Sequence, residues 1–416
     1  MSIAANVANE SWFQDPALAR IFSLLNQDGE EVRVVGGAVR NALMRLPVTD
    51  TDLATTWAPA EVMARAEAEG IRAVPTGIDH GTVTLVIDGR GFEVTTLRHD
   101  AETDGRRAKV VFGSDWQCDA ERRDFTINAL YADQSGAIID LVGGLGDIAS
   151  RTVRFIGDPD DRIAEDHLRI LRYFRFFAHY GAGRPDAAAL KACARARDSL
   201  VKLSAERVWK ELKTLLKARD PGRALLWMRQ AGILSLVVPE SEKWGIDSIG
   251  GLIATETALG WEPDPLLRLM AIVPPDTERM RELSVRLKLS RADSERLVQW
   301  TQAPVIASTL AITALDRLLY RHGADPIMDR IRLSLVSARA RTDADPAALT
   351  EAAGHSRHLA RAESWERPMF PVKGSDLMAQ GIEPGPAMGA RLAALEERWI
   401  DSNFTLDKQK LLADPD

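Results

Sequence analysis

Two aspartates at alternate positions are the first candidates for chemistry in this sequence. Asp50 and Asp52 stand at the start of a short apolar segment, Leu53-Ala54. Because alternate residues of a β-strand point to the same face, the two carboxylates could share divalent metal ions. Two such ions, held about 3.5–4 Å apart, activate an attacking hydroxyl and stabilise a leaving oxygen. The spacing therefore predicts a two-metal centre, with a solvated strand start as the plainer alternative.

A glycine pair precedes these aspartates in the chain. Gly36 and Gly37 leave the apolar segment 31–35, where we expect a strand, and enter a short helix expected over 38–46. Glycine lets backbone N–H groups approach a phosphate closely. Arg40, one turn into the helix, can donate two hydrogen bonds to the same phosphate. The pattern predicts a phosphate site next to the metal site.

Glu93 is the candidate for a third carboxylate. It lies in the segment 92–97, which alternates in character and pairs with 82–87 in an expected hairpin. Phe92 and Val94 occupy the opposite face of that strand. We expect Glu93 on the inner face of the sheet, where a glutamate is unfavourable unless it is paired or bound to metal. An exposed strand carboxylate is the alternative.

The elements that would position these residues form an α/β head. We further expect a strand over 50–54, a helix over 59–69, a helix over 120–131 and a strand over 137–141. Residues 98–116 are polar and lack periodicity, so we expect a structureless loop long enough to be functional.

Beyond residue 151 the strand signals fade and the rest of the chain is expected to be all-α. Residues 167–179 predict an amphipathic helix, with an apolar stripe opposite three arginines. Further helices are expected over 206–216, 279–287, 293–302 and 315–321. Prolines suggest the remaining breaks. The predicted parts are a catalytic head (1–150), a helical neck (151–238), a helical body (239–367) and a helical tail (368–416).

Composition excludes several protein classes. The chain has 416 residues, of which 45% are apolar, and no run approaches the length of roughly 18 apolar residues that a membrane helix requires. We expect no membrane association and no signal peptide, because residues 1–13 lack both a basic residue and a long apolar block. The two cysteines match no metal or disulfide pattern. A cytoplasmic location is therefore expected.

Charge is unevenly distributed along the chain. The total is −7, yet residues 151–230 contain 18 Lys and Arg against 10 Asp and Glu, a local balance of +8. A basic segment in an otherwise acidic protein is a candidate surface for an RNA backbone. Solvated helix faces are the alternative.

These segments together resemble the class II nucleotidyltransferases, the family of CCA-adding tRNA nucleotidyltransferases and bacterial poly(A) polymerases. The resemblance covers nearly the whole chain, and four segments carry it. They are Gly36–Arg40 with Asp50 and Asp52, then Glu121–Ala129, then Glu165–Arg169, and then Ser204–Leu212. One position departs from the family pattern, since Asn41 stands where an aspartate usually follows the motif arginine.

The resemblance implies a polymerase β-like head and transfer of C, C and A from CTP and ATP to the 3′ end of tRNA. It implies that the neck (151–238) selects the nucleotide and that the tail (368–416) binds tRNA. It also implies Mg²⁺ at Asp50 and Asp52, and it places Arg122, Asp124 and Asn128 near the nucleotide. On the expected helix Arg122 and Arg123 should diverge, so that one faces the triphosphate. Asp124 and Asn128 should share a face of that helix.

The resemblance further assigns base choice to Asp166 and Arg169. On a helix these residues would share a face, one accepting and the other donating hydrogen bonds. Cytosine and adenine each offer an amino donor beside a ring acceptor, which matches this pair. Uracil and guanine present the reverse, and an unmet buried polar group costs roughly 1–3 kcal/mol. A surface ion pair is the plainer alternative.

Three other functions remain open at this point. A poly(A) polymerase is disfavoured because Thr76–Val83 resembles the CCA-adding form. A CC-adding enzyme is disfavoured because the loop 98–116, with Thr103–Arg106, resembles that of enzymes adding all three nucleotides. We expect this loop to govern the switch from C to A. An inactive RNA-binding adaptor is disfavoured because it would not need the two clustered aspartates.

Overall fold

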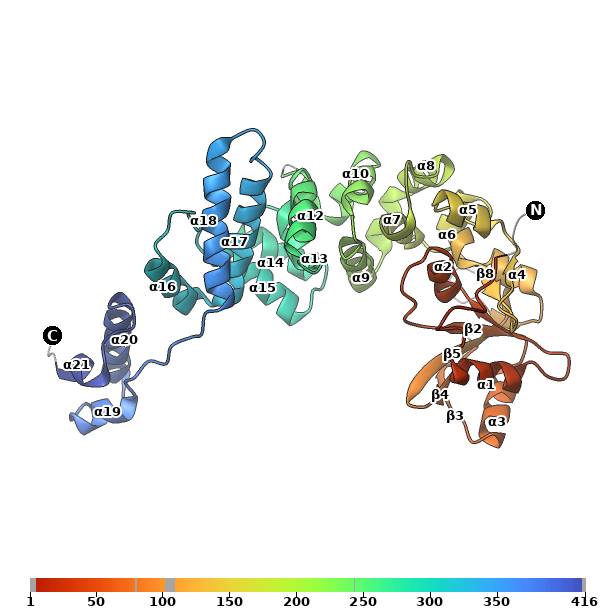
Figure 1. The fold of residues 1–416 in the computed structure, drawn as a ribbon, viewed down its shortest axis with the longest axis horizontal. Helices are drawn as coiled ribbons and strands as arrows, with labels where there is room; N and C mark the ends of the chain where they lie inside the picture. The colour runs from red at the N-terminus through yellow and green to blue at the C-terminus, as the bar shows by residue number, and fades with distance from the viewer. Residues whose placement is uncertain (1–4, 79–80, 102–108, 243, 414–416) are drawn as a thin grey trace. The chain divides into compact units, whose positions relative to one another are not determined.

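The computed structural model describes residues 5–78, 81–101, 109–242 and 244–413 (Figure 1). The chain divides into two compact units. Unit 1 comprises Met1–Leu203 and Gln230–Leu236, and unit 2 comprises Ser204–Arg229 and Val237–Asp416. No helix in the described ranges is long and apolar enough to cross a membrane.

A seven-stranded sheet forms the centre of unit 1 (Figure 1). Its strand order is β3-β4-β5-β2-β1-β8-β9, and only the β2–β5 pair is parallel. The strands are β1 (Val32–Val35), β2 (Asp52–Thr55), β3 (Arg72–Gly77), β4 (Thr82–Ile87), β5 (Arg90–Thr96), β8 (Leu130–Ala132) and β9 (Ile138–Asp140). The strand expectations for the head, including the hairpin of β4 and β5, are confirmed.

One face of this sheet is apolar because its strands alternate in character. Leu53 and Val94 are paired across β2 and β5, and both are buried. Two helices, α1 (Pro16–Leu25) and α3 (Pro59–Ala68), contact each other and pack against strands of the sheet. This burial leaves the residues that alternate with Leu53 and Val94, namely Asp52 and Glu93, on the other face.

Two expectations about the head are wrong. Residues 98–116 are not structureless, because β6 (Arg98–Ala101) and β7 (Lys109–Phe112) pair as a two-stranded sheet. Residues 102–108, including the segment Thr103–Arg106, lie outside the described residues, so the role of this loop stays a prediction.

The single helix expected over 120–131 is instead three short elements. They are α4 (Trp116–Glu121), a 3₁₀ turn η2 (Thr126–Asn128) and strand β8. The helix begins earlier because Asp115 caps its N-terminus. It ends early because Phe125 takes an extended conformation and the following residues pair with β1. Local helical periodicity is thus overridden by sheet pairing.

Helices account for the remainder of unit 1. They are α2 (Gly37–Leu43), α5 (Gly144–Ser150), α6 (Pro159–Glu165), α7 (Arg169–Tyr180), α8 (Ala187–Arg195) and the 3₁₀ helix η3 (Arg197–Lys202), with α11 (Leu234–Val237) at the end of the second segment. Helix α7 buries the expected apolar stripe. Its Tyr173 and Phe176 pack with Phe125 and Phe155 in an aromatic cluster, with ring centroids 4.8 Å apart for Phe125 and Phe176. This cluster joins the middle of α7 to the turn that carries η2.

The described part of unit 2 is helical. Its helices are α9 (Ala205–Leu216), α10 (Gly222–Gln230), η4 (Pro239–Ser241), α12 (Ser248–Leu259), α13 (Pro265–Ile272), α14 (Thr277–Arg286), α15 (Arg291–Gln302), α16 (Ile312–His322), α17 (Ala324–Arg339), α18 (Pro346–Glu363), α19 (Gly374–Ala379), α20 (Pro386–Asp401) and α21 (Lys408–Ala413). The expected all-α region and the helices predicted within it are confirmed.

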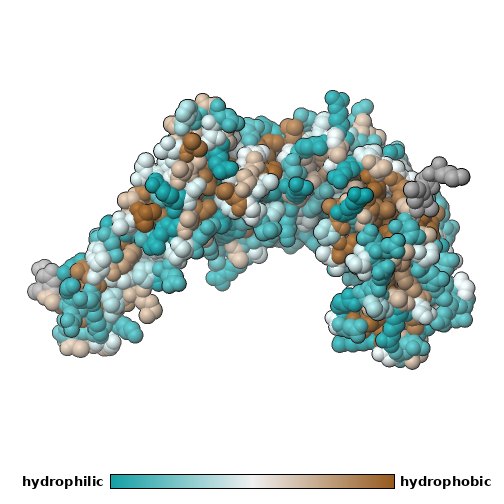
Figure 2. All heavy atoms as spheres, viewed as in Figure 1, coloured by the Kyte–Doolittle hydropathy of each residue, from teal (hydrophilic) through white to brown (hydrophobic). Residues whose placement is uncertain are grey.

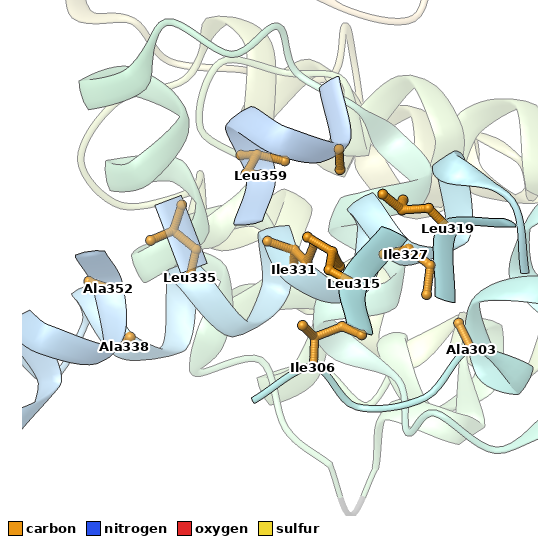
Figure 3. Packing of buried hydrophobic residues seen from close by; sticks show 11 residues of the cluster. Ala303, Ile306, Leu315, Leu319, Ile327, Ile331, Leu335, Ala338, Ala352 and Leu359 are labelled. Carbon is orange, nitrogen blue, oxygen red and sulfur yellow. The ribbon is translucent and has the colours of Figure 1, made fainter. Parts of the chain in front are cut away.

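Apolar side chains from α16, α17 and α18 form one core of unit 2. Leu315 and Leu319 of α16 meet Ile327 and Ile331 of α17 (Figure 3), and Leu359 of α18 belongs to the same cluster. A second cluster gathers residues of α19, α20 and α21, including Trp399. On the face drawn in Figure 2, hydrophilic residues cover most of the surface of both units.

Candidate active site

The predicted metal carboxylates gather at one end of three neighbouring strands. Asp52 pairs with Val35 of β1, and the register of β2 with β5 places it beside Glu93. Strand β2 begins at Asp52, and Asp50 lies two residues before it. The Oδ2 atom of Asp50 accepts a hydrogen bond from the Thr49 hydroxyl at 3.0 Å. All three carboxylates are exposed. Glu93 is therefore not buried as expected, but it does lie next to Asp52 on the same face.

The electrostatics of this group favour a cation. Desolvation by surrounding protein atoms raises the pKa of Asp52 above its usual range, and the negative charges of Glu93 and Asp50 raise it further. A bound cation would remove this repulsion, because opposite charge stabilises the ionised carboxylate.

The donor set fits a metal that shares its coordination with substrate. Within the described ranges, no three acidic, histidine or cysteine side chains converge closely enough to hold a metal ion alone. Mg²⁺ is usually held by only one or two carboxylates together with water and substrate phosphates. Asp50 and Asp52 provide the two carboxylates that such a site needs.

The glycine pair follows directly from β1, beside Asp52. Gly36 has a φ of 73°, a conformation that disfavours any side chain, and a Cβ there would lie 3.5 Å from the Asn128 carbonyl oxygen. Its N–H donates to the Leu130 carbonyl at 3.1 Å. Gly36 therefore shapes the turn into α2, and an approaching phosphate would have to use N–H groups that follow it.

Arg40 is buried inside the head rather than displayed at its surface. Its guanidinium donates to Asn128, to Asn41 at 2.9 Å and to the Tyr180 hydroxyl at 2.8 Å, and it lies 3.9 Å from the centre of the Tyr180 ring. Burial lowers the pKa of Arg40, although Tyr180 and Asp124 favour its charge. Arg40 thus braces α2 against α7, and its predicted contact with phosphate stays a prediction.

Asn41, the position that departs from the family pattern, has two partners. Its carbonyl oxygen accepts from Arg40, while its amide donates to the Pro47 carbonyl at 2.9 Å. An aspartate could not make the second bond, because an ionised carboxylate only accepts.

Arg122 and Arg123 do not diverge as expected, because both lie within reach of Asp119, three and four residues earlier in α4. Both side chains turn back to Asp119, with Arg122 Nε at 2.8 Å and Arg123 Nη2 at 2.9 Å from its two oxygens. The hydroxyl of Tyr131 donates to the same carboxylate at 2.8 Å. Burial alone would raise the pKa of Asp119, but the charges of Arg123 and Arg122 hold it below the usual range.

Asp124 and Asn128 do meet, although through a turn rather than along a helix. The Asn128 amide donates to Asp124 at 3.1 Å, and Arg172 of α7 donates to the same aspartate from Nε at 2.9 Å. Burial opposes ionisation of Asp124, yet Arg172 keeps its pKa below the usual range. Since Asn128 also contacts Arg40, one hydrogen-bonded chain runs from Arg40 through Asn128 and Asp124 to Arg172.

Asp166 and Arg169 lie close together, but not on one helix. Asp166 ends α6 in an extended conformation, and its side chain accepts from the Leu168 N–H at 3.1 Å. Arg169 begins α7, where it pairs with Glu165 and donates to the Arg162 carbonyl at 2.8 Å. The expected shared helix face is wrong, because the chain turns between α6 and α7.

Sequence reasoning missed the residues that hold the candidate side chains in place, notably Asp119, Tyr131, Arg162, Arg172 and Tyr180. Asp119 could have been found, since it precedes Arg122 and Arg123 by three and four residues, the spacing of helical ion pairs. The others are joined by tertiary contacts between distant segments and leave no local signal.

Comparison with known proteins places the chain in a family. Residues 32–154 match the poly A polymerase head domain, and residues 184–244 match the probable RNA and SrmB-binding site of polymerase A. The chain is 31% identical to the mitochondrial CCA tRNA nucleotidyltransferase 1 of Mus musculus, over 95% of this chain and 89% of that protein. The chain belongs to the CCA-adding tRNA nucleotidyltransferase family. It is also 31% identical to the CCA-adding enzyme of Limosilactobacillus fermentum, over 94% of each chain.

Solved structures agree with this family. The CCA-adding enzyme of Bacillus stearothermophilus in complex with CTP matches with a TM-score of 0.69 and 26% identity, over 92% of each chain. The Thermotoga maritima CCA-adding enzyme complexed with tRNA matches with a TM-score of 0.65 over 96% of this chain and 95% of that one; at 19% identity it supports the fold alone. The resemblance, the fold class and the expectation of a tRNA nucleotidyltransferase are confirmed. Nucleotidyltransferases of this family use divalent metal ions.

Proposed function

We propose that this protein adds C, C and A to the 3′ end of tRNA, using CTP and ATP and releasing pyrophosphate. The observation that carries this proposal is the position of Asp50, Asp52 and Glu93 together at one end of the sheet, next to the glycine turn. Relatives that align with nearly the whole chain bear the name of this activity.

In the proposed reaction the 3′-oxygen of the tRNA attacks the α-phosphorus of the incoming nucleotide. A new ester bond forms, and the bond between the α-phosphorus and the bridging oxygen breaks to release pyrophosphate. Asp50 and Asp52 would hold Mg²⁺, with Glu93 assisting. When bound, the metal would lower the pKa of the attacking hydroxyl and neutralise charge on the leaving group.

The protein side chains would orient the nucleotide. Gly36, Gly37 and Arg40 are proposed to position phosphates, and Arg122, Asp124 and Asn128 to lie near the ribose and triphosphate. Neighbouring side chains hold two of these residues in place, since Asp119 restrains Arg122 and Arg172 restrains Asp124. Such restraint favours transfer, since reacting groups that are held in place need less ordering to reach the transition state.

Asp166 and Arg169 are proposed to choose the base. The contacts of Arg169 with Glu165 and with the Arg162 carbonyl both use Nη1. Its other N–H groups would donate to the ring acceptor of cytosine or adenine, while Asp166 accepts from the amino group. Asp166→Asn or Arg169→Ala should therefore lower use of CTP and relax discrimination against UTP and GTP. Unchanged selectivity among the four nucleotides would place base choice elsewhere.

The proposed activity is tested by supplying each nucleotide singly and together to tRNA lacking its 3′ end, with Mg²⁺, and sequencing the products. Addition of C, C and then A is expected. A long run of A would instead support a poly(A) polymerase, and products ending in CC would support the CC-adding alternative.

The metal carboxylates give a second test of the same reaction. Asp50→Ala and Asp52→Ala should abolish addition of both C and A while tRNA binding survives, because each removes a ligand of the shared metal centre. Asp198→Ala, at an exposed aspartate of η3, is the matched control and should keep activity. Turnover like that of the wild type in either site variant would exclude the assignment. Glu93→Gln should also lower activity severely, but less than Asp50→Ala or Asp52→Ala does.

The cytoplasmic location and the division into head, neck, body and tail at residues 150, 238 and 367 stay predictions. RNA contacts within the basic segment 151–230 also stay predictions.

A further inference from the structure

Arg162 lies outside every segment that carried the family resemblance, yet it connects two of them. It is buried in the middle of α6, with its side chain 11% exposed. Its Nη2 donates to the main-chain carbonyls of Arg122 and Arg123, the latter at 2.7 Å. Its Nη1 donates to Glu165 at 2.8 Å. One guanidinium therefore reaches across about 40 residues of sequence to hold the turn before Asp124.

Arg169 depends on the same residue. Its Nη1 donates to the Arg162 main-chain carbonyl at 2.8 Å, and its other contact is Glu165, which Arg162 also holds. The Glu165 carboxylate thus lies between two arginines. If the Arg162 side chain were lost, Glu165 would no longer be held from its other side, and the bond to the Arg162 main-chain carbonyl would be the remaining fixed contact of the Arg169 guanidinium.

The turn at Arg122 and Arg123 is restrained from two sides. The side chains of both residues are fixed on Asp119, and their carbonyls are fixed on Arg162. Arg162 is the residue of α6 whose side chain holds the carbonyls of this turn, while the neighbouring Asp124 is bonded through its own carbonyl to the Ile156 N–H just before α6.

We propose that Arg162 is a positioning residue that fixes the base-reading pair, Asp166 and Arg169, relative to the turn Arg122–Asp124, and that it thereby sets nucleotide selectivity. The proposal rests on the proposed function. Arg162 touches neither base nor phosphate in this scheme. It acts by directing Arg169, and a base-reading donor displaced by about 1 Å loses much of its discrimination.

The geometry requires an arginine. Three acceptors, two carbonyls and a carboxylate, surround one planar group, and a guanidinium offers five N–H groups in a fixed fork. A lysine has a single nitrogen on a flexible chain and can satisfy only some of these acceptors. A methionine of similar length fills the space but donates nothing.

The test compares Arg162→Met, Arg162→Lys and the wild type on tRNA lacking its 3′ end. The readout is the ratio of kcat/KM for CTP to that for UTP, together with the KM for tRNA. A ratio measured in one preparation does not depend on how much of the enzyme is folded. We expect Arg162→Met to lower this ratio about tenfold or more, with the KM for tRNA nearly unchanged and Arg162→Lys intermediate.

Arg195→Met is the matched control. Arg195 is exposed on α8 and pairs with Asp160 of α6, the helix that also carries Arg162. Asp160 lies outside both the turn Arg122–Asp124 and the segment Glu165–Arg169. This variant should keep both the ratio and the rates, because an exposed ion pair contributes little.

Each outcome decides the proposal. An unchanged ratio in Arg162→Met, with a lower overall rate, would mean that Arg162 only supports the fold and would overturn the inference. If Arg162→Met yields no folded protein, Arg162→Lys carries the test, and an unchanged ratio there overturns it equally. Failure of the wild type to add C or A would instead refute the proposed function.

Discussion

Replacing Asp52 with asparagine should stabilise the metal-free protein while it abolishes activity. The pKa of Asp52 is raised in the folded state, by desolvation first and then by the charges of Glu93 and Asp50. A carboxyl whose pKa is raised by folding stabilises the folded state below its unfolded pKa. That stability is lost as the pH rises through the folded pKa. At neutral pH the ionised Asp52 therefore lowers the free energy of unfolding, and a neutral isostere removes this loss.

The magnitude follows from the strand geometry. Neighbouring strands lie about 4.8 Å apart. Two unit charges at about 5 Å repel by about 0.8 kcal/mol in water and by about 3 kcal/mol at an effective dielectric constant of 20. Because Asp52 and Glu93 are both exposed, solvent screening selects the lower end, about 1 kcal/mol. For a folding unit of this size that corresponds to a rise of about 2–4 °C in Tm.

The assay is thermal unfolding at pH 7 and at a pH below about 3.9, the ordinary pKa of aspartate, with and without Mg²⁺. Asp52→Asn should raise Tm at pH 7 without metal and lose this advantage at the lower pH, where Asp52 is protonated in both states. Mg²⁺ should raise the Tm of the wild type more than that of the variant.

Glu67→Gln is the matched control for this experiment, since Glu67 is an exposed carboxylate on α3. Its Tm should stay within about 1 °C of the wild type. A lower Tm for Asp52→Asn than for the wild type at pH 7 without metal would show that Asp52 is not under electrostatic strain, and the reasoning would fail.

Two further predictions concern buried charges. Asp119→Asn leaves two partly buried arginines uncompensated, so we expect a loss of about 3–5 kcal/mol in the free energy of unfolding, measured by denaturation. We also expect a higher KM for nucleotide, measured by steady-state kinetics. Since the pKa of Asp119 is lowered by folding, its contribution to stability exists above the unfolded pKa and disappears as the pH falls through the folded pKa. If the stability of the variant fell with acid as much as that of the wild type, this reasoning would be contradicted. In unit 2, Arg268 is 1% exposed and pairs with Glu256 at 2.6 Å. Arg268→Met should therefore lower the free energy of unfolding by about 3–5 kcal/mol. Adding Glu256→Gln to this variant should recover part of that loss, because it removes the unpaired buried charge. Equal stability of the single and double variants in urea unfolding would show that the stranded Glu256 charge is not the cause.

Local sequence was sufficient where an element is specified by its own periodicity and end signals. The hairpin of β4 and β5 follows from alternating character and a glycine turn, and α7 follows from its apolar stripe. The pairing of Asp52 with Glu93 was also accessible in part, because alternation alone places each on the face opposite its apolar neighbours. What alternation could not tell is that this face is open to solvent.

The failures share a physical cause. Residues 120–131 are helical in pattern, but α4 ends at Glu121 and Leu130–Ala132 pairs with β1 as strand β8. A segment in which local preference and tertiary pairing disagree is decided by the pairing. Arg122 and Arg123 converge on Asp119 because they follow it by three and four residues at the end of α4.

The candidate site residues of this protein could be found without a structure: the paired aspartates, the glycine turn and the proposed base-reading pair are residue types at short spacings, and short spacings fix which groups are neighbours. How these groups are held became visible only in the folded chain. Arg40 is braced by Tyr180, Asp124 by Arg172, and Arg169 through Arg162. The first two contacts join segments 140 and 48 residues apart. A contact over such a distance depends on how the whole chain packs, which no local pattern encodes.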